Sequence, residues 1–162
     1  VELTTIHAVT LTQSLLDDAG KSFDRGRAAF QNIIPTTSGA AKAVVKTIPS
    51  LKNKLEVMSI RVPVPTVSMC DTTVVVGKST TIEEVNHAFK VASETGMNNI
   101  LQYATETLVS SDYIGSPYSC IFDSNYTKVI DGNMIKVIGW YDNEWGYTCR
   151  LSDLVIRLGH FL

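Results

Sequence analysis

The chain has 162 residues, 14 Lys and Arg against 16 Asp and Glu, a net charge of −2 and 44% hydrophobic residues. This is the composition of an ordinary globular domain, and a charge so close to zero argues against a nucleic-acid partner. No apolar run approaches the roughly 20 residues that span a bilayer, and the first residues lack the pattern of a signal peptide, so we expect no membrane partner. The three cysteines are odd in number and far apart. They exclude a disulfide scaffold and a cysteine-rich zinc site, and they favour a reducing, cytoplasmic location.

The first half of the chain predicts three strands, a long loop and a helix. A strand runs through Thr4-Thr5-Ile6-His7, and the mixed, polar residues 14–32 predict a long surface loop. The alanine-rich residues after Ser38 predict a helix that this serine can cap. The alternation over 56–62 predicts a strand with Arg61 on its more polar side, together with Val57 and Ser59, and the β-branched residues 67–76 predict another.

The second half mixes helices with strands that short turns connect. Two overlapping capping boxes, Thr80 to Glu83 and Thr81 to Glu84, predict a helix over 81–94. We expect a short helix near 98–103, strands over 119–123 and 127–130, a hairpin at 131–132 leading into a strand over 134–141, and an amphipathic helix over 151–158. No glycine-rich dinucleotide fingerprint is present. The pattern predicts an α+β fold with a mixed, largely antiparallel sheet and helices packed on one face.

Several residues are candidates for a functional site, and each of them also has a purely structural interpretation. The ordinary pKa of a histidine side chain, about 6.5, makes His7 a candidate general base, although a lone histidine is more often structural. Ser38 and Gly39 open a helix, where free N–H groups suit an oxyanion, although plain capping is commoner. Arg61 suits a phosphate or a surface salt bridge. The aromatic and polar residues 140–147 suit either a platform for a planar ring, with Asn143 as its amide partner, or a packed strand end.

Four ordered motifs resemble the catalytic half of phosphorylating glyceraldehyde-3-phosphate dehydrogenase. They are TTIHA at 4–8, NIIPTTSGAAKA at 32–43, RVP at 61–63 and WYDNEWGY at 140–147. The resemblance covers essentially all of residues 1–162 and implies the C-terminal catalytic domain of this family. The family's N-terminal NAD-binding domain, and the Ser-Cys-Thr-Thr-Asn-Cys segment with its nucleophilic cysteine, do not occur in this chain. We therefore expect the isolated chain to be inactive, and we assign the nucleophile to none of Cys70, Cys120 and Cys149.

The resemblance also implies a role for individual residues. His7 looks like the catalytic base. Within the loop, Asp24 stands where the family often has Arg, and a carboxylate beside Arg25 weakens an anion site, so we do not include Arg25. The loop over 14–32 resembles a segment that lines the subunit interface of a homotetramer. Thr10, Thr12 and Arg61 look like ligands of the substrate phosphate, Ser38 and Gly39 like the site of inorganic phosphate, and Asn143 and Tyr147 like neighbours of the nicotinamide.

The family's reaction defines the expected function. The full-length enzyme would oxidise glyceraldehyde 3-phosphate with NAD and inorganic phosphate, through a thioester to an acyl phosphate, as in glycolysis; no metal is implied. NADP in place of NAD is left open. One alternative is a related dehydrogenase for erythrose 4-phosphate. Another is a non-catalytic assembly or binding module.

Overall fold

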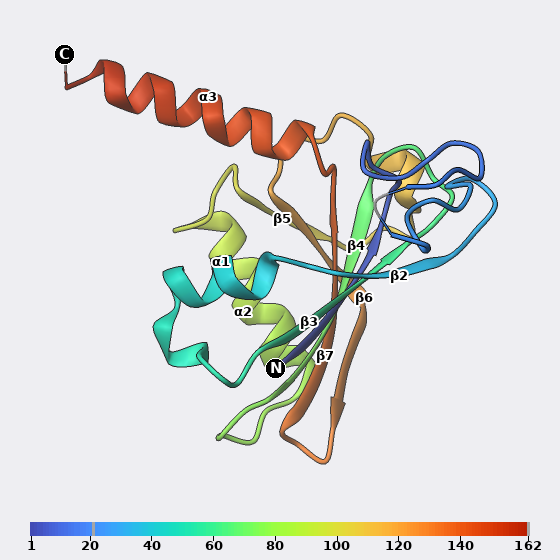
Figure 1. The fold of residues 1–162 in the computed structure, drawn as a ribbon. Helices are drawn as coiled ribbons and strands as arrows, with labels where there is room; N and C mark the ends of the chain where they lie inside the picture. Colours follow the sequence, from blue (N-terminus) through green and yellow to red (C-terminus); the bar gives the residue numbers. More distant parts are fainter. Residues whose placement is uncertain (21, 162) are drawn as a thin grey trace.

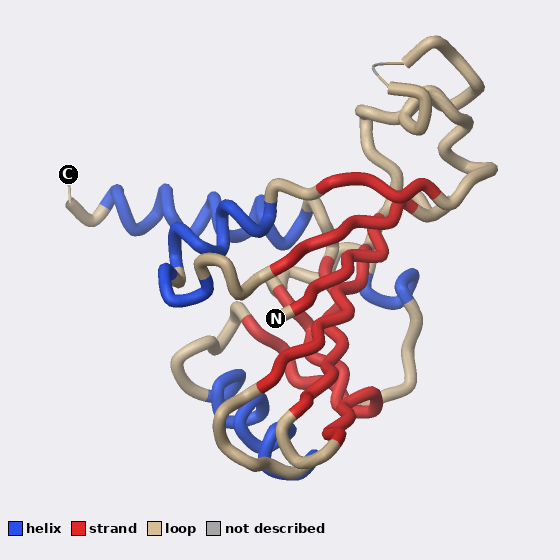
Figure 2. The backbone as a smooth tube through the Cα atoms, turned by 60° about the horizontal axis from the view of Figure 1, so that its bottom comes forward, coloured by secondary structure: helices blue, strands red, loops and turns tan. Residues whose placement is uncertain are grey.

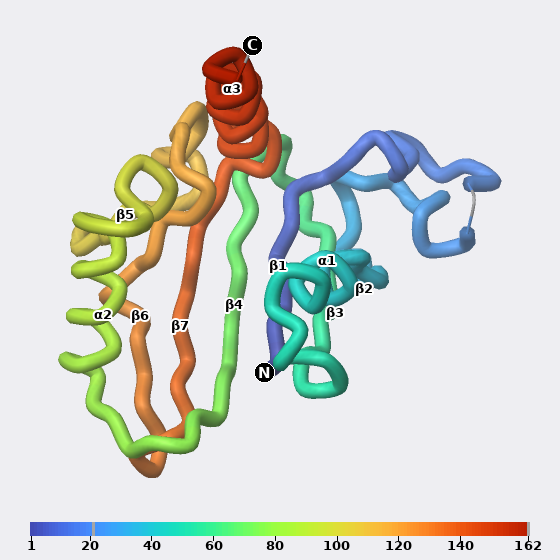
Figure 3. The backbone as a smooth tube through the Cα atoms, turned by 90° about the vertical axis from the view of Figure 1, so that its left-hand side faces the viewer, coloured from blue at the N-terminus to red at the C-terminus, as the bar shows by residue number. Residues whose placement is uncertain are grey.

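The computed structural model describes residues 1–20 and 22–161, and its centre is one seven-stranded sheet. The strand order is β2-β3-β1-β4-β7-β6-β5, which Figure 3 shows from one side. The β1–β3 and β5–β6 pairs are parallel, and the four other pairs are antiparallel. The predicted α+β fold with a mixed, largely antiparallel sheet is confirmed. The strands are β1 (Glu2–His7), β2 (Ile34–Thr37), β3 (Glu56–Arg61), β4 (Ser68–Val75), β5 (Leu101–Ala104), β6 (Cys120–Ile130) and β7 (Met134–Tyr141).

Two helices, α1 (Ala40–Thr47) and α2 (Ile82–Glu94), lie on the same face of the sheet (Figure 1). The capping box that predicts α2 is present, because the Thr81 hydroxyl accepts from the Glu84 N–H while the Glu84 carboxylate accepts from the Thr81 N–H. Phe89 stacks on Phe122 of β6 with ring centroids 3.9 Å apart, which fixes α2 on the sheet. Two short 3₁₀ helices, Pro49–Leu51 and Ser110–Tyr113, also occur in the fold.

The third helix, α3 (Trp145–Gly159), follows β7 and extends away from the sheet (Figure 1). Only Gly146 of this helix is buried. The loop that joins β1 to β2 likewise reaches beyond the end of the sheet (Figure 2). Among the described residues, no helix combines the length and the apolar character needed to cross a membrane.

One predicted helix is absent, and the start of another differs from prediction in its capping residue. Residues 98–103 do not form a helix, because Leu101 begins β5 and pairs with Cys120 of β6. The helix predicted after Ser38 is confirmed as α1, which begins at Ala40 directly after the unpredicted strand β2 at residues 34–37. Its N-cap is Gly39 without a side-chain hydrogen bond, and Ser38 is not the cap. Edge strands of four residues leave little periodicity in the sequence.

The strands around β6 and β3 also differ from prediction. The strands expected over 119–123 and 127–130 are one strand, β6, with an irregular register between Asp123 and Lys128. In β3 the side with Val57 and Ser59 is buried, whereas Met58 on the opposite side is 47% exposed. The side that carries Arg61 therefore faces inward. This orientation brings Arg61 into the site described next.

Candidate active site

Four strands bring polar side chains together at one end of the sheet. His7 is the last residue of β1, and it lies beside Arg61, the last residue of the parallel strand β3. Ser68 is the first residue of β4, and it pairs with Tyr141, the last residue of β7. Since β4 is antiparallel to β1, and β7 is antiparallel to β4, the start of β4 and the end of β7 lie at the same end of the sheet as His7 and Arg61.

The imidazole of His7 is held in one tautomer. Its Nδ1 lies 2.7 Å from the carbonyl oxygen of Ala8. Because a carbonyl only accepts, Nδ1 carries the proton and Nε2 keeps a free lone pair. Partial burial lowers the pKa of His7, the hydrogen bond to Ala8 raises it, and the charge of Arg61 lowers it further, with a net lowering from the ordinary 6.5. His7 is therefore neutral at pH 7 and able to accept a proton.

Arg61 presents a guanidinium that has no carboxylate partner among residues 1–20 and 22–161. Its Nη1 donates to the same Ala8 carbonyl at 3.3 Å. None of the ion pairs among the described residues involves Arg61, so the surface salt-bridge interpretation is not supported. Burial lowers the pKa of Arg61, Tyr141 raises it and the charge of Arg25 lowers it. A cation that faces a second cation is suited to an anionic ligand.

The predicted ligands Thr10 and Thr12 lie in the turn that follows β1. Their hydroxyl oxygens are 2.9 Å apart, and the Thr10 N–H donates to Gln13 Oε1 at 3.0 Å. Thr12 and Arg61 line one small cavity, so the structure brings these two predicted ligands together. The other residues that line it are Gln13, Arg25, Ile34 and Thr36.

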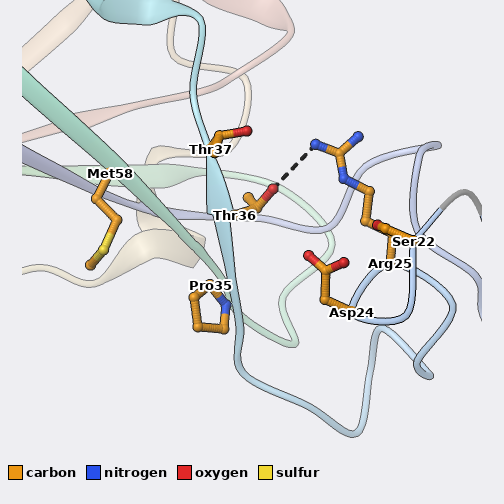
Figure 4. A pocket seen from close by; sticks show the side chains of 7 residues that line it. All are labelled: Ser22, Asp24, Arg25, Pro35, Thr36, Thr37 and Met58. Carbon is orange, nitrogen blue, oxygen red and sulfur yellow. Dashed lines mark hydrogen bonds between the residues drawn. The ribbon is translucent and has the colours of Figure 1, made fainter.

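Arg25, which the sequence analysis does not include among the ligands, also belongs to this region. Its Nη2 donates to Thr36 Oγ1 at 3.2 Å (Figure 4). A larger open pocket of about 590 Å³ adjoins it, with Asp24 in its lining, so the carboxylate does lie beside this cation. The contact joins the long loop to β2. No local pattern in the sequence predicts a contact of this kind.

Ser38 and Gly39 lie just before α1. The Ser38 hydroxyl accepts from the Ala40 N–H at 3.2 Å, and Gly39 is exposed. Among the described residues, neither one shares a hydrogen bond or a pocket with His7 or Arg61. Their role as the site of inorganic phosphate stays a prediction.

Asn143 and Tyr147 occupy different surroundings. Asn143 Oδ1 accepts from the Ser68 hydroxyl at 3.3 Å, which connects it to the strand ends that carry His7. Tyr147 lies on α3 and is 71% exposed. The structure thus brings Asn143 toward the site. Among the described residues, no hydrogen bond or ring contact connects Tyr147 to it.

Cys70 and Cys120 lack the surroundings of an activated nucleophile. Burial raises the pKa of Cys70 to about 11 and that of Cys120 to about 12. A reactive thiolate needs the opposite shift. Within the described part of the chain, no group of three or more His, Cys, Asp or Glu residues could hold a metal ion.

Comparison with known proteins assigns the chain to a family. A profile described as glyceraldehyde 3-phosphate dehydrogenase, C-terminal domain, matches residues 1–143. The chain is 51% identical over 160 residues to glyceraldehyde-3-phosphate dehydrogenase 2 of Streptomyces avermitilis, covering 99% of the chain and 48% of that protein. It is 50% identical to the glyceraldehyde-3-phosphate dehydrogenases of Streptomyces coelicolor and Mycobacterium avium, covering 48% and 47% of those proteins.

The chain belongs to the glyceraldehyde-3-phosphate dehydrogenase family and corresponds to its C-terminal domain. These relatives are oxidoreductases by name. The chain spans about half the length of each curated relative that it matches.

Proposed function

We propose that this chain is the catalytic half of an NAD-dependent, phosphorylating glyceraldehyde-3-phosphate dehydrogenase. One observation carries the proposal: in a chain of this family, a neutral His7 with a free Nε2 lies beside Arg61, which has no carboxylate partner among the described residues. A base and a cation side by side suit an aldehyde that carries a phosphate. In the longer protein, a cysteine from outside this chain would supply the nucleophile.

His7 would act as the proton acceptor. When the thiol adds to the aldehyde, the new hydroxyl group must lose its proton as hydride leaves the same carbon. His7 Nε2 would take this proton and would return it when the cycle closes. The thioester that results would be attacked by inorganic phosphate, with loss of the thiolate and formation of an acyl phosphate. Ser38 and Gly39 are the proposed ligands of that phosphate.

Arg61, Thr10 and Thr12 would hold the phosphate of the substrate itself. Arg61 and Thr12 line one cavity, and Arg25 adds a second guanidinium to it. Bidentate guanidinium contacts orient a phosphate and so place the aldehyde carbon next to His7. The two guanidinium groups and the Thr12 hydroxyl that converge on this small cavity are the physical support for this assignment.

NAD, when bound, supplies the hydride acceptor. Asn143 fits the nicotinamide carboxamide, because its Oδ1 already accepts from Ser68 and its amide NH₂ is left to donate. Tyr147 is proposed as a packing neighbour. We further propose that the full-length protein is a cytoplasmic homotetramer that acts in glycolysis, and that the isolated chain is inactive.

The test is a single-turnover measurement on the full-length protein with glyceraldehyde 3-phosphate. His7→Asn should slow the chemical step by roughly 10²–10⁴-fold, the usual contribution of a general base. His87→Asn, which replaces an exposed histidine of α2, is the matched control and should leave the rate unchanged. An unchanged rate for His7→Asn would remove His7 from the mechanism. A higher kcat/KM with erythrose 4-phosphate would favour the related dehydrogenase.

A further inference from the structure

Val67 has a backbone conformation that its side chain disfavours. Its φ is +66°, in the left-handed region, where a β-branched residue is a genuine outlier. The side chain is 1% exposed and packs in a buried cluster with Ala104, Tyr113 and Ile121. Packing therefore holds the strained residue in place, and such strain concentrates at functional sites.

The next residue, Ser68, connects two parts of the candidate site. Its side chain is also 1% exposed. Ser68 Oγ accepts from the Ala8 N–H at 3.1 Å and donates to Asn143 Oδ1 at 3.3 Å. The hydroxyl has one proton, and since the Ala8 N–H can only donate, this proton goes to Asn143 Oδ1 in the observed arrangement, with the Tyr141 hydroxyl as a further neighbour of Ser68. Asn143 thus presents its oxygen to Ser68, which leaves its NH₂ group for another acceptor.

The backbone of Ala8 connects the hydrogen bond from Ser68 to His7, the proposed base. Ala8 is fully buried. Its N–H is fixed by Ser68, and its carbonyl accepts from both His7 Nδ1 and Arg61 Nη1. The Ala8 N–H belongs to the planar peptide that joins His7 to Ala8, so the bond from Ser68 restrains the main chain that connects the imidazole to the Ala8 carbonyl and leaves only φ and ψ of Ala8 free between them.

We propose that Ser68, aimed by the strained backbone of Val67, is a positioning residue that serves the base and the cofactor together. Through Ala8 it keeps the proton of His7 on Nδ1, and directly it orients the amide of Asn143 to donate. Ser68 itself touches neither substrate nor cofactor. This inference rests on the proposed function for its catalytic consequence, but the two hydrogen bonds of Ser68 can be tested independently of activity.

The first test is nitrogen NMR of the His7 ring and hydrogen exchange of the Ala8 amide in the 162-residue chain. The unsubstituted chain should show the Nδ1–H form and slow exchange at Ala8. Ser68→Ala should lower the ratio of the Nδ1–H to the Nε2–H form about tenfold, the factor that corresponds to one net hydrogen bond, and Ser68→Thr should restore it. An Nε2–H form in the unsubstituted chain would overturn the proposal even if Ser68→Ala did not fold.

Ser59→Ala is the matched control. Ser59 lies in the same sheet and is 2% exposed, and its hydroxyl has no hydrogen-bond partner in the part of the chain that the structure describes. Its replacement should leave the His7 tautomer and the Ala8 exchange rate unchanged. An equal change in both serine variants would show a general packing effect and would overturn the proposal.

The second test uses the full-length protein. Ser68→Ala should lower the single-turnover rate about tenfold and also raise the KM for NAD about tenfold, since one hydroxyl serves both His7 and Asn143. A loss in only one of the two parameters would overturn the shared role. If the parent protein has no dehydrogenase activity but the NMR results hold, the proposed function fails and the positioning of His7 by Ser68 stands. If the parent is active and the tautomer does not respond, the positioning role fails alone.

Discussion

Asp142 joins three segments beside the candidate site, and its replacement tests the local structure that places Asn143. The side chain is 6% exposed. Its Oδ2 accepts from the Gly115 N–H at 2.9 Å, and its Oδ1 accepts from the N–H groups of Glu144 at 3.1 Å and Trp145 at 2.9 Å. Asp142 thus holds the start of α3, the turn at Gly115 and the end of β7 together.

The size of the effect follows from these three bonds. A hydrogen bond to a charged group contributes about 1.5–3 kcal/mol, but Gly115, Glu144 and Trp145 are exposed, so water replaces part of each loss. About 1 kcal/mol for each bond gives a destabilisation of about 3 kcal/mol for Asp142→Ala. Asp142→Asn keeps one acceptor oxygen but turns an NH₂ group toward another N–H group. We expect it to cost about 1–2 kcal/mol.

The effect must also depend on pH. Burial raises the pKa of Asp142, but the three backbone donors lower it more, so the folded pKa lies below the ordinary 3.8. The stabilisation is therefore present above pH 3.8 and is lost as the pH falls through the folded pKa. The difference between the parent and Asp142→Ala should be full at pH 7 and should shrink as the pH falls below 3.8.

Urea unfolding followed by circular dichroism measures both effects. Asp153→Ala is the control, because Asp153 is an exposed residue of α3 with a side chain 62% accessible in its pair with Arg150. This variant should cost less than about 1 kcal/mol. A loss below about 1 kcal/mol for Asp142→Ala at pH 7, or a difference that does not shrink on acidification, would refute the reasoning.

Three further predictions concern His7, Val67 and the buried thiols. The pKa of His7, measured by NMR titration, should lie below 6.5. Arg61→Gln should raise this pKa, but burial should still keep it below 6.5. A pKa at or above 6.5 in the unsubstituted chain would contradict this prediction. In urea unfolding, Val67→Gly should be about 1 kcal/mol more stable than Val67→Ala, because only glycine accepts φ +66° freely. In an ordinary strand the alanine variant is the more stable of the two. A more stable alanine variant here would disprove the strain. Cys70 and Cys120 should react slowly with iodoacetamide near pH 7 and faster only toward about pH 11. An inflection near about pH 8.5 in the pH profile of their reaction rates would be inconsistent with their burial.

The sequence predicts those elements whose signals are local. The helix over 81–94 is correct because its capping box and apolar spacing lie within the helix itself. The hairpin at Asp131-Gly132 is confirmed because both residues adopt positive φ, as the turn requires. The sequence does not predict β2 and β5, because each has four residues and forms only by pairing with a strand that the local sequence does not specify.

The same distinction applies to the candidate site. His7, Arg61 and Asn143 stand in sequence motifs, so the order of the residues along the chain is enough to nominate them. Ser68 cannot be nominated in this way, because its partners lie 60 and 75 positions away along the chain. The carboxylate next to Arg25 can be seen in the sequence and argues against Arg25 as an anion ligand. The hydrogen bond between Arg25 and Thr36 of β2 forms only when the loop is folded.

The shared carbonyl of Ala8 has a consequence for the base. The positive charge of Arg61 lowers the pKa of His7, since both side chains meet at this oxygen. An anion bound to Arg61 would cancel part of that charge, so substrate binding would itself make His7 a stronger base. We therefore expect inorganic phosphate to raise the pKa of His7 in an NMR titration of the chain, and Arg61→Gln to abolish the rise. If phosphate left the pKa unchanged or lowered it, Arg61 would not be the site where an anion acts on His7.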